Sequence, residues 1–316
     1  LAVVFVFFGG AGGDGANGWS VTVVHSGYFS EFVENVRGLV AQSIGGGGGN
    51  ARSNILLGLT DDGSDGSSKQ AGRSGTIATD VSIGGLTGDG ADGGAVSVNH
   101  SGSLTTSGTN ATALFAQSVG GGGGDAASSV TNNFQRRVAT SLVFGREGGT
   151  GGVGGNVDVT AAGTIIASGD TSRGIFAQSV GGGGGNSETS ALSVEGAKRA
   201  KSGDETSANL ELALGRKGGT GGVSGDVTVT TSAEVSTSGD RAHAVFAQSV
   251  GGGGGTGGSA VIDLTQEAVS NVLDSFNGGA ASEEEVTGYS LAVQDGGEGG
   301  SGAQRGDVRL ENLGQA

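Results

Sequence analysis

The chain has 316 residues, and its 72 glycines stand against 11 Phe, 2 Tyr and 1 Trp, which argues against a conventional globular core. Its formal net charge of −15 argues against nucleic acid as a partner, because such binding depends on Lys and Arg side chains that neutralise phosphates. The absence of cysteine excludes disulfides and thiolate metal sites.

The first predicted element is the apolar run LAVVFVFF at residues 1–8. Eight residues are too few to span a bilayer, and the run lacks the basic leader of a signal peptide. We therefore expect a strand here and no transmembrane segment in this chain.

A module of 44 residues follows four times without gaps, and each copy ends in AQSIGGGGG or AQSVGGGGG. Repetition at a fixed length is the signature of repeat architectures. The first copy is a candidate cap, because bulky Phe32 and Val33 stand where the fourth copy has Ser238 and Gly239. The chain thus divides into modules at 1–49, 81–124, 142–185, 212–255 and, truncated, 291–316, with variable inserts at 50–80, 125–141, 186–211 and 256–290.

Two stretches of the fourth module predict strands. VTVTT at 227–231 alternates apolar and polar residues with a period of two. AVFAQSV at 244–250 begins apolar on both faces, as a buried strand does. The best helical candidate is Leu264–Phe276 in the last insert, where apolar residues recur at three- and four-residue spacing.

These elements predict an all-β fold, an elongated repeat β-solenoid of the parallel β-helix kind with glycine-rich turns and variable inserts. With roughly two to three coils per repeat and about 4.8 Å between strands, we expect a rod on the order of 50 to 70 Å long. In such a stack Gln117, Gln178 and Gln248 share one environment, and we expect their amides to pair with exposed backbone at a corner.

The five-glycine runs are interpreted as structural turns, because glycine accepts positive φ and close backbone approach. The alternative, a phosphate-binding loop, requires a following Lys. The residues that follow the runs are Asn50, Asp125, Asn186 and Thr256.

The three histidines are the first residues to test for catalysis. His25 and His100 occupy the same module position, and His243 occupies another. No nucleophile and carboxylate recur beside them, so a repeated surface or corner position explains them better than a catalytic triad. We predict no catalytic residue, no cofactor-binding residue and no enzyme activity.

Calcium is the alternative for the acidic turns. GGAGGD at 9–14 resembles the start of the nonapeptide calcium repeat, and TGDGADGG at 87–94 is acidic. The first motif is not in tandem and has Ala16 where a large apolar residue is needed. DDGSDG at 61–66 has Gly72, not Glu, at the twelfth position of a calcium loop. Solvated turns explain these segments better, so we expect no metal ligands.

Two further functions remain alternatives. Glu283, Glu284 and Glu285 form an adjacent run typical of a solvated loop, whereas a glycosidase needs two carboxylates held across a sugar. Parallel β-solenoids nevertheless host polysaccharide-cleaving enzymes, so polysaccharide binding or cleavage stays open. The Thr-rich alternation of VTVTTS could form an ice-binding face, although Thr is also simply a good strand former.

The FAQSVGGGGG units, preceded by GG-x-GG, GDVTV and S-x-x-TSGD, resemble the glycine-rich repeats in passenger regions of large proteobacterial autotransporters and related surface fibre proteins. The resemblance covers nearly the whole chain apart from the inserts. It implies an elongated β-solenoid secreted through the outer membrane by a C-terminal β-barrel and displayed on the cell surface, with an adhesive or structural role.

We therefore expect a non-enzymatic extracellular protein, a passenger or fibre segment that associates with itself end to end or laterally. Surface glycans or host and environmental surfaces are the other expected partners. Any specificity is expected in the inserts, since they differ in length and charge while the modules do not.

Overall fold

The computed structural model describes residues 2–8, 10–59, 77–134, 138–194, 207–264 and 288–313. Every regular element within these ranges is a strand, and every strand pairing is parallel. This confirms the all-β prediction. The helical candidate cannot be compared in full, because Leu264 ends a strand and residues 265–276 lie outside the described ranges.

The strands form four sheets. Sheet A contains, in order, β1 (Ala2–Phe8), β5 (Ile77–Ile83), β9 (Val138–Phe144), β13 (Ser207–Leu214) and β18 (Gly288–Asp295). Sheet B contains β2 (Val21–Glu31), β6 (Val96–Ser107), β10 (Val157–Ser168), β14 (Val227–Thr231) and β19 (Val308–Asn312), with β15 (Glu234–Ser238) also paired to β10. Sheet C contains β3 (Arg37–Ile44), β7 (Thr112–Val119), β11 (Arg173–Val180) and β16 (His243–Val250). Sheet D contains β4 (Asn54–Leu59), β8 (Ser129–Phe134), β12 (Ser190–Val194) and β17 (Ala260–Leu264).

Three strands predicted from the sequence are confirmed. The opening run forms β1, VTVTT forms β14, and AVFAQSV lies within β16. In β14 the two valines of the alternating pattern, Val227 and Val229, are fully buried.

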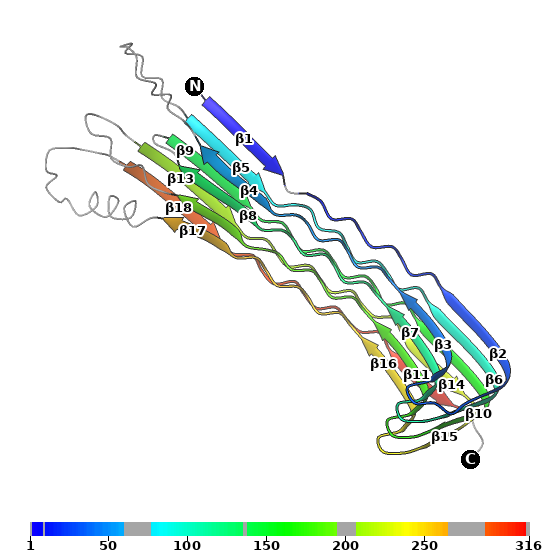
Figure 1. The fold of residues 1–316 in the computed structure, drawn as a ribbon. Helices are drawn as coiled ribbons and strands as arrows, with labels where there is room; N and C mark the ends of the chain where they lie inside the picture. The colour runs from blue at the N-terminus through cyan, green and yellow to red at the C-terminus, as the bar shows by residue number, and fades with distance from the viewer. Residues whose placement is uncertain are drawn as a thin grey trace, which may run out of the picture.

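The chain visits the sheets in the order A, B, C, D and then returns to A; we call one such circuit a pass. Sheets A and D lie at one end of the molecule and sheets B and C at the other (Figure 1). Extended glycine-rich segments join the two ends. The AB connectors are residues 10–20, 84–95, 145–156, 215–226 and 296–307, and the CD connectors are 45–53, 120–128, 181–189 and 251–259.

Successive passes differ in length only outside the described ranges. Partner residues in neighbouring passes are 75, 61, 70 and 81 positions apart. Subtracting the 17, 3, 12 and 23 residues at 60–76, 135–137, 195–206 and 265–287 leaves 58 residues in each pass. Each insert therefore begins in a CD connector, continues through a sheet D strand and ends in a sheet A strand, and its variable part lies between these two strands.

Successive modules pair with each other in register, so each module adds a single layer where two to three coils were expected. Ala116 pairs with Ala177, and Ala177 with Ala247, at the same position of successive modules. Five layers at about 4.8 Å stack to only roughly 20 Å, whereas residues 77–107, at about 3.2 Å each, span roughly 100 Å. The long dimension of this molecule therefore runs along the strands (Figure 1).

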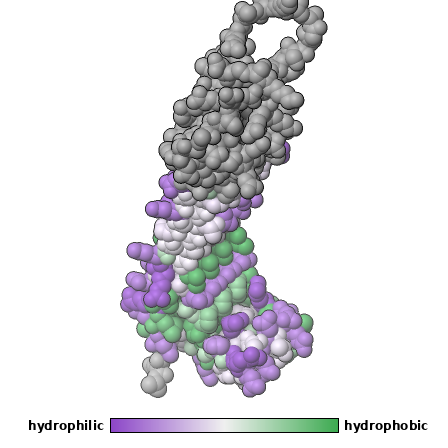
Figure 2. Space-filling view, turned by 90° about the vertical axis from the view of Figure 1, so that its left-hand side faces the viewer, coloured by the Kyte–Doolittle hydropathy of each residue, from purple (hydrophilic) through white to green (hydrophobic). Residues whose placement is uncertain are grey.

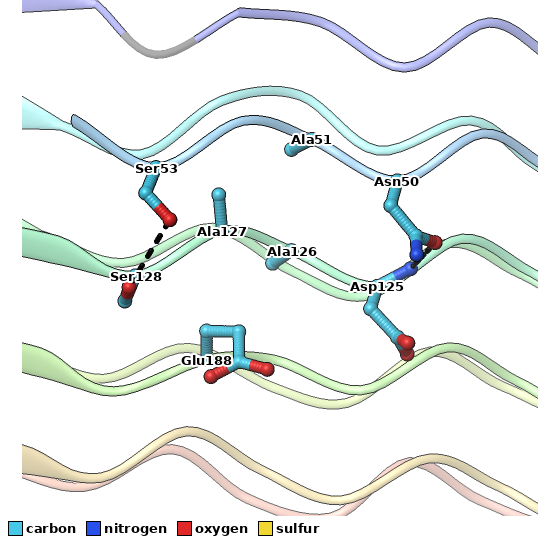
Figure 3. Close-up of a pocket in the computed structure, with 8 residues that line it drawn as sticks. All are labelled: Asn50, Ala51, Ser53, Asp125, Ala126, Ala127, Ser128 and Glu188. Atoms are coloured by element: carbon cyan, nitrogen blue, oxygen red, sulfur yellow. Dashed lines mark hydrogen bonds between the residues drawn. The ribbon is translucent and has the colours of Figure 1, made fainter.

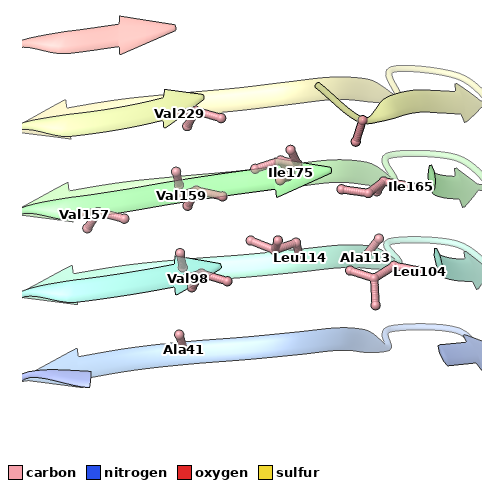
Figure 4. Packing of buried hydrophobic residues seen from close by; sticks show 14 of the residues in the cluster. Ala41, Val98, Leu104, Ala113, Leu114, Val157, Val159, Ile165, Ile175 and Val229 are labelled. Carbon is pink, nitrogen blue, oxygen red and sulfur yellow. The ribbon is translucent and has the colours of Figure 1, made fainter. Parts of the chain in front are cut away.

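The main core lies between sheets B and C. Val98, Val159 and Val229 of sheet B face Leu114 and Ile175 of sheet C, and all are at most 1% exposed (Figure 4). Val143, Ala213 and Ala260 form a smaller cluster at the other end. Between these two clusters the connectors pack backbone against backbone.

Hydrogen bonds in the connectors repeat every three residues. The amide of Gly88 donates to Gly49 O in the opposite connector at 3.0 Å, and Gly90 N donates to Thr150 O in the next pass at 2.8 Å. The intervening amide, that of Asp89, donates to Asp14 Oδ1 in the preceding pass at 2.9 Å. An extended chain with three residues per helical turn makes no hydrogen bonds within itself. Its amides therefore need the three kinds of partner described above, which lie on three sides of the chain.

This arrangement explains the glycine runs and corrects their interpretation as turns. In the run 181–185, a Cβ on Gly182 would lie 1.9 Å from Gly121 O, and one on Gly184 would lie 2.1 Å from Gly219 O. A Cβ on Gly183 would have its nearest neighbour at 3.9 Å. No glycine of the runs has a positive φ. Glycine is required here because neighbouring backbones touch on two of the three sides of each extended chain.

Candidate interaction surface

The four letters before each glycine run have separate structural roles. Ala116 and Ser118 of β7 point into the molecule and are fully buried. Ser118 Oγ donates to Gly94 O at 2.9 Å and accepts from Gly155 N at 2.8 Å, which fastens sheet C to two AB connectors. Gln117 and Val119 are partly exposed on the other side of the strand.

The outward side of sheet C carries three rows of matched side chains, which we call the ladder face. Figure 2 shows hydrophobic rows separated by a hydrophilic row on this side of the molecule. The aromatic row is Val40, Phe115, Phe176 and Phe246, the amide row is Gln42, Gln117, Gln178 and Gln248, and the aliphatic row is Ile44, Val119, Val180 and Val250.

The aromatic row is a parallel stack. The ring centroids of Phe115 and Phe176 are 4.9 Å apart with an interplanar angle of 1°, and those of Phe176 and Phe246 are 5.3 Å apart at 2°. The guanidinium of Arg37 lies 4.1 Å from the Phe115 centroid, so a cation covers one end of the stack. Arg173 lies near both of the other rings, at 5.4 and 5.6 Å. These contacts hold the rings in place.

The amide row is continuous across the four passes. Gln42 Nε2 donates to Gln117 Oε1 at 2.6 Å, Gln117 to Gln178 at 2.7 Å, and Gln178 to Gln248 at 2.8 Å. The shared environment predicted for these glutamines is thus confirmed. Their expected partner was wrong: each amide pairs with the amide of the next pass, because parallel in-register strands place identical side chains side by side.

Acidic and amide side chains on the connectors also act between passes. Asn50 Oδ1 accepts from Asp125 N at 2.8 Å, and Asp125 Oδ1 accepts from Asn186 N at 2.7 Å. Asp14 and Asp89, in the two candidate calcium segments, do the same for Asp89 N and Thr150 N. One oxygen of each carboxylate thus caps an outward backbone amide. No group of three or more His, Cys, Asp or Glu side chains able to hold a metal occurs in the part of the chain that the structure describes.

A shallow depression of about 310 Å³ lies on the CD connectors (Figure 3). Its floor is formed by small residues such as Ala51, Ala126 and Ala127, and Ser53 Oγ lies 3.4 Å from Ser128 Oγ across it. Asp125 and Glu188 come from successive passes. Since Asp125 already accepts a backbone amide, the depression is a gap between capping side chains more than a built ligand site.

His100 does not have the surface position expected of the three histidines, whereas His243 is exposed as expected. His25 and His100 are register partners, as the module alignment predicted, but His100 is fully buried, so a surface position is wrong for it. Their Nδ1 atoms are 3.0 Å apart and their rings are stacked. Burial, and secondarily the charge of His25, lowers the pKa of His100. His243 is exposed and packs edge-on against Phe246.

The remaining candidates from the sequence are two acidic segments and the threonine-rich strand. Asp61–Gly66 and Glu283–Glu285 lie outside the described residues. The outward row of sheet B that contains Thr228 also contains Ser97 and Asp158, so it is not a uniform threonine array.

No family model, curated protein or solved structure matches the chain. In the residues that the structure covers, no helix has the length and hydrophobicity that a membrane span requires.

Proposed function

We propose that the chain is a segment of an elongated β-solenoid that serves as a non-enzymatic structural and adhesive element, displayed outside a bacterial cell as an autotransporter passenger or surface fibre. The observation that carries this proposal is the stacking of equivalent residues in register through successive passes, seen in the Phe and Gln rows and in the connectors. The repeat letters that resemble autotransporter passengers are those that make these contacts.

The geometry supports a load-bearing role. Strand pairs, connector bonds and side-chain rows all join one pass to the next, so each layer is held along the full length of the strands. The connectors contain hydrogen-bonded backbone where a globular enzyme has a packed side-chain core. A layer of this kind resists separation because many hydrogen bonds must break together.

The ladder face supports self-association side by side. Its twelve side chains, in the three rows defined above, contain no acidic residue, although the chain carries a net charge of −15. Two acidic molecules can therefore meet through this face without bringing carboxylates together. The open strand edge of the last pass provides a second route, end to end.

Partner specificity, in this proposal, belongs to the inserts. A matched test replaces residues 60–76, 195–206 and 265–287 with the three residues at 135–137, which already join two passes in this chain. We expect the shortened variant to keep the circular dichroism spectrum and urea midpoint of the natural chain and to lose its binding to a glycan array, measured with and without calcium.

Two results would contradict the proposal. Loss of folding in the shortened variant would show that the passes are not a self-sufficient scaffold. Compact particles of equal dimensions in electron microscopy of the natural chain would remove the elongated body on which the role depends.

A further inference from the structure

The register row that begins at Trp19 has one residue type in every later pass. Its members in the second to fifth passes are Gly94, Gly155, Gly225 and Gly306. A Cβ on Gly94 would lie 2.4 Å from Trp19 C and O, and one on Gly155 would lie 2.5 Å from Gly94 O. The side-chain direction at this position therefore points at the backbone of the preceding pass, and only glycine fits once a preceding pass is present.

Trp19 occupies the same backbone position as its glycine partners. Its carbonyl accepts from Ser43 Oγ at 2.8 Å, just as Gly94 O accepts from Ser118 Oγ at 2.9 Å. The indole nevertheless has room, because none of the described residues forms a pass on the other side of the first one, and Trp19 is 88% exposed. The largest side chain thus stands at the first-pass edge, in the direction from which another pass would approach.

Other residues at the first-pass edge have free space on the side from which another pass would approach. Gly13 has no atom within 4 Å of its Cβ direction, whereas its partner Gly88 would meet Gly13 O at 1.9 Å. Gly27 is likewise open, whereas Gly102 would meet Gly27 O at 2.2 Å. These glycines would accept a further pass. Val33 also stands where the later passes have Gly108, Gly169 and Gly239, but it lacks their positive φ, so Trp19 is the departure whose backbone matches that of its partners.

We propose that Trp19 closes the first-pass edge to in-register addition of another pass, whether from a second copy of this chain or from chain that precedes residue 1. Seating a pass there would place the indole in space that the neighbouring backbone must occupy. The stack consequently extends only from its fifth-pass edge, where Val308 and Leu310 are about half exposed although their partners Val227 and Val229 are fully buried. This inference depends on the stacking geometry and is independent of the proposed surface role.

The test adds one pass in front of the chain. Residues 77–137 form a complete pass with the shortest link, and Ile77 and Val138 are in register with Ala2 through β5. This segment is joined to Ala2 in the natural background, in Trp19→Gly, and in a control, Tyr28→Ser, which changes another exposed aromatic residue whose register partner is Ser103.

Hydrogen exchange of the intact proteins counts the protected amides. Each extended chain is compared with the same background without the added pass, which we call its parent. We expect extension to add protected amides in Trp19→Gly and none in the natural or Tyr28→Ser backgrounds. Trp19 is the sole tryptophan, so its fluorescence reports the same event. In the extended natural chain we expect it to stay as accessible to iodide as in the parent. Equal gains in all backgrounds, gains in none, or a shielded Trp19 would overturn the proposal.

Discussion

Adjacent glycines in one run should respond in opposite ways to the same substitution. Gly182→Ala places a methyl group 1.9 Å from Gly121 O, and a normal contact exceeds 3.0 Å, so the backbone must move by more than 1 Å. That shift breaks or lengthens the bonds from Gly182 N to Gly152 O and from Gly222 N to Gly182 O, now 2.8 and 2.7 Å. Two weakened hydrogen bonds and an overpacked site together destabilise the fold by about 2–4 kcal/mol.

Gly183→Ala is the matched control, because its Cβ has 3.9 Å of clearance from Gly253 O. An alanine tolerated by the extended backbone reduces the entropy of the unfolded chain, so stability should rise by about 0.4–1 kcal/mol. Urea unfolding followed by circular dichroism gives both values, and the pairs Gly121/Gly122 and Gly252/Gly253 serve as replicates in other passes. Equal effects within each pair would refute the backbone-contact explanation of the glycine runs.

The remaining predictions concern side chains between passes. Because the pKa of His100 is lowered in the folded state, the unfolded chain binds more protons, and stability should fall as the pH drops below about 6.5, by at most about 1.4 kcal/mol per pH unit. His100→Ala, which copies the register partner Ala161, should flatten urea midpoints between pH 7 and pH 5, and a slope like that of the natural chain would contradict this. Gln178→Ala removes two hydrogen bonds between side-chain amides and should lower the unfolding free energy by about 1–2 kcal/mol. An unchanged urea midpoint would show that the amide row does not stabilise the fold. Asp125→Ala leaves an exposed backbone amide to water, so the unfolding free energy should change by less than about 0.5 kcal/mol; a larger loss would contradict a minor role for the capping bonds.

Some parts of the interaction surface followed from the sequence. The spacing of the AQSV letters placed Gln117, Gln178 and Gln248 together, and the alignment of His25 with His100 was correct. In a parallel in-register stack, residues at the same position of successive modules lie side by side. The sequence could therefore predict which residues are neighbours. The partner of each amide was not, because an amide bonds equally well to backbone and to another amide.

The sheet D strands show a different limit. NILLGL, SVTNNF, SALSV and AVIDL are register partners, yet no matching position has the same letter in more than two of them. Parallel pairing requires a constant number of residues per pass and a strand-forming backbone, and it tolerates varied side chains at the end of the molecule. A search for repeated letters therefore assigned these strands to the inserts.

The sequence by itself determined the strands β1, β14 and β16, the shared position of Gln117, Gln178 and Gln248, and the exclusion of thiol chemistry. Only the tertiary structure decided that the glycine runs extend where they were expected to turn, that one module makes one layer, and that His100 is buried. The physical reason is that an extended glycine chain has no internal hydrogen bonds, so the direction of each amide and each missing Cβ is fixed by the neighbouring passes. The role of Trp19 depends on the tertiary structure for the same reason, because the sequence does not show that its side chain points toward the position of a preceding pass.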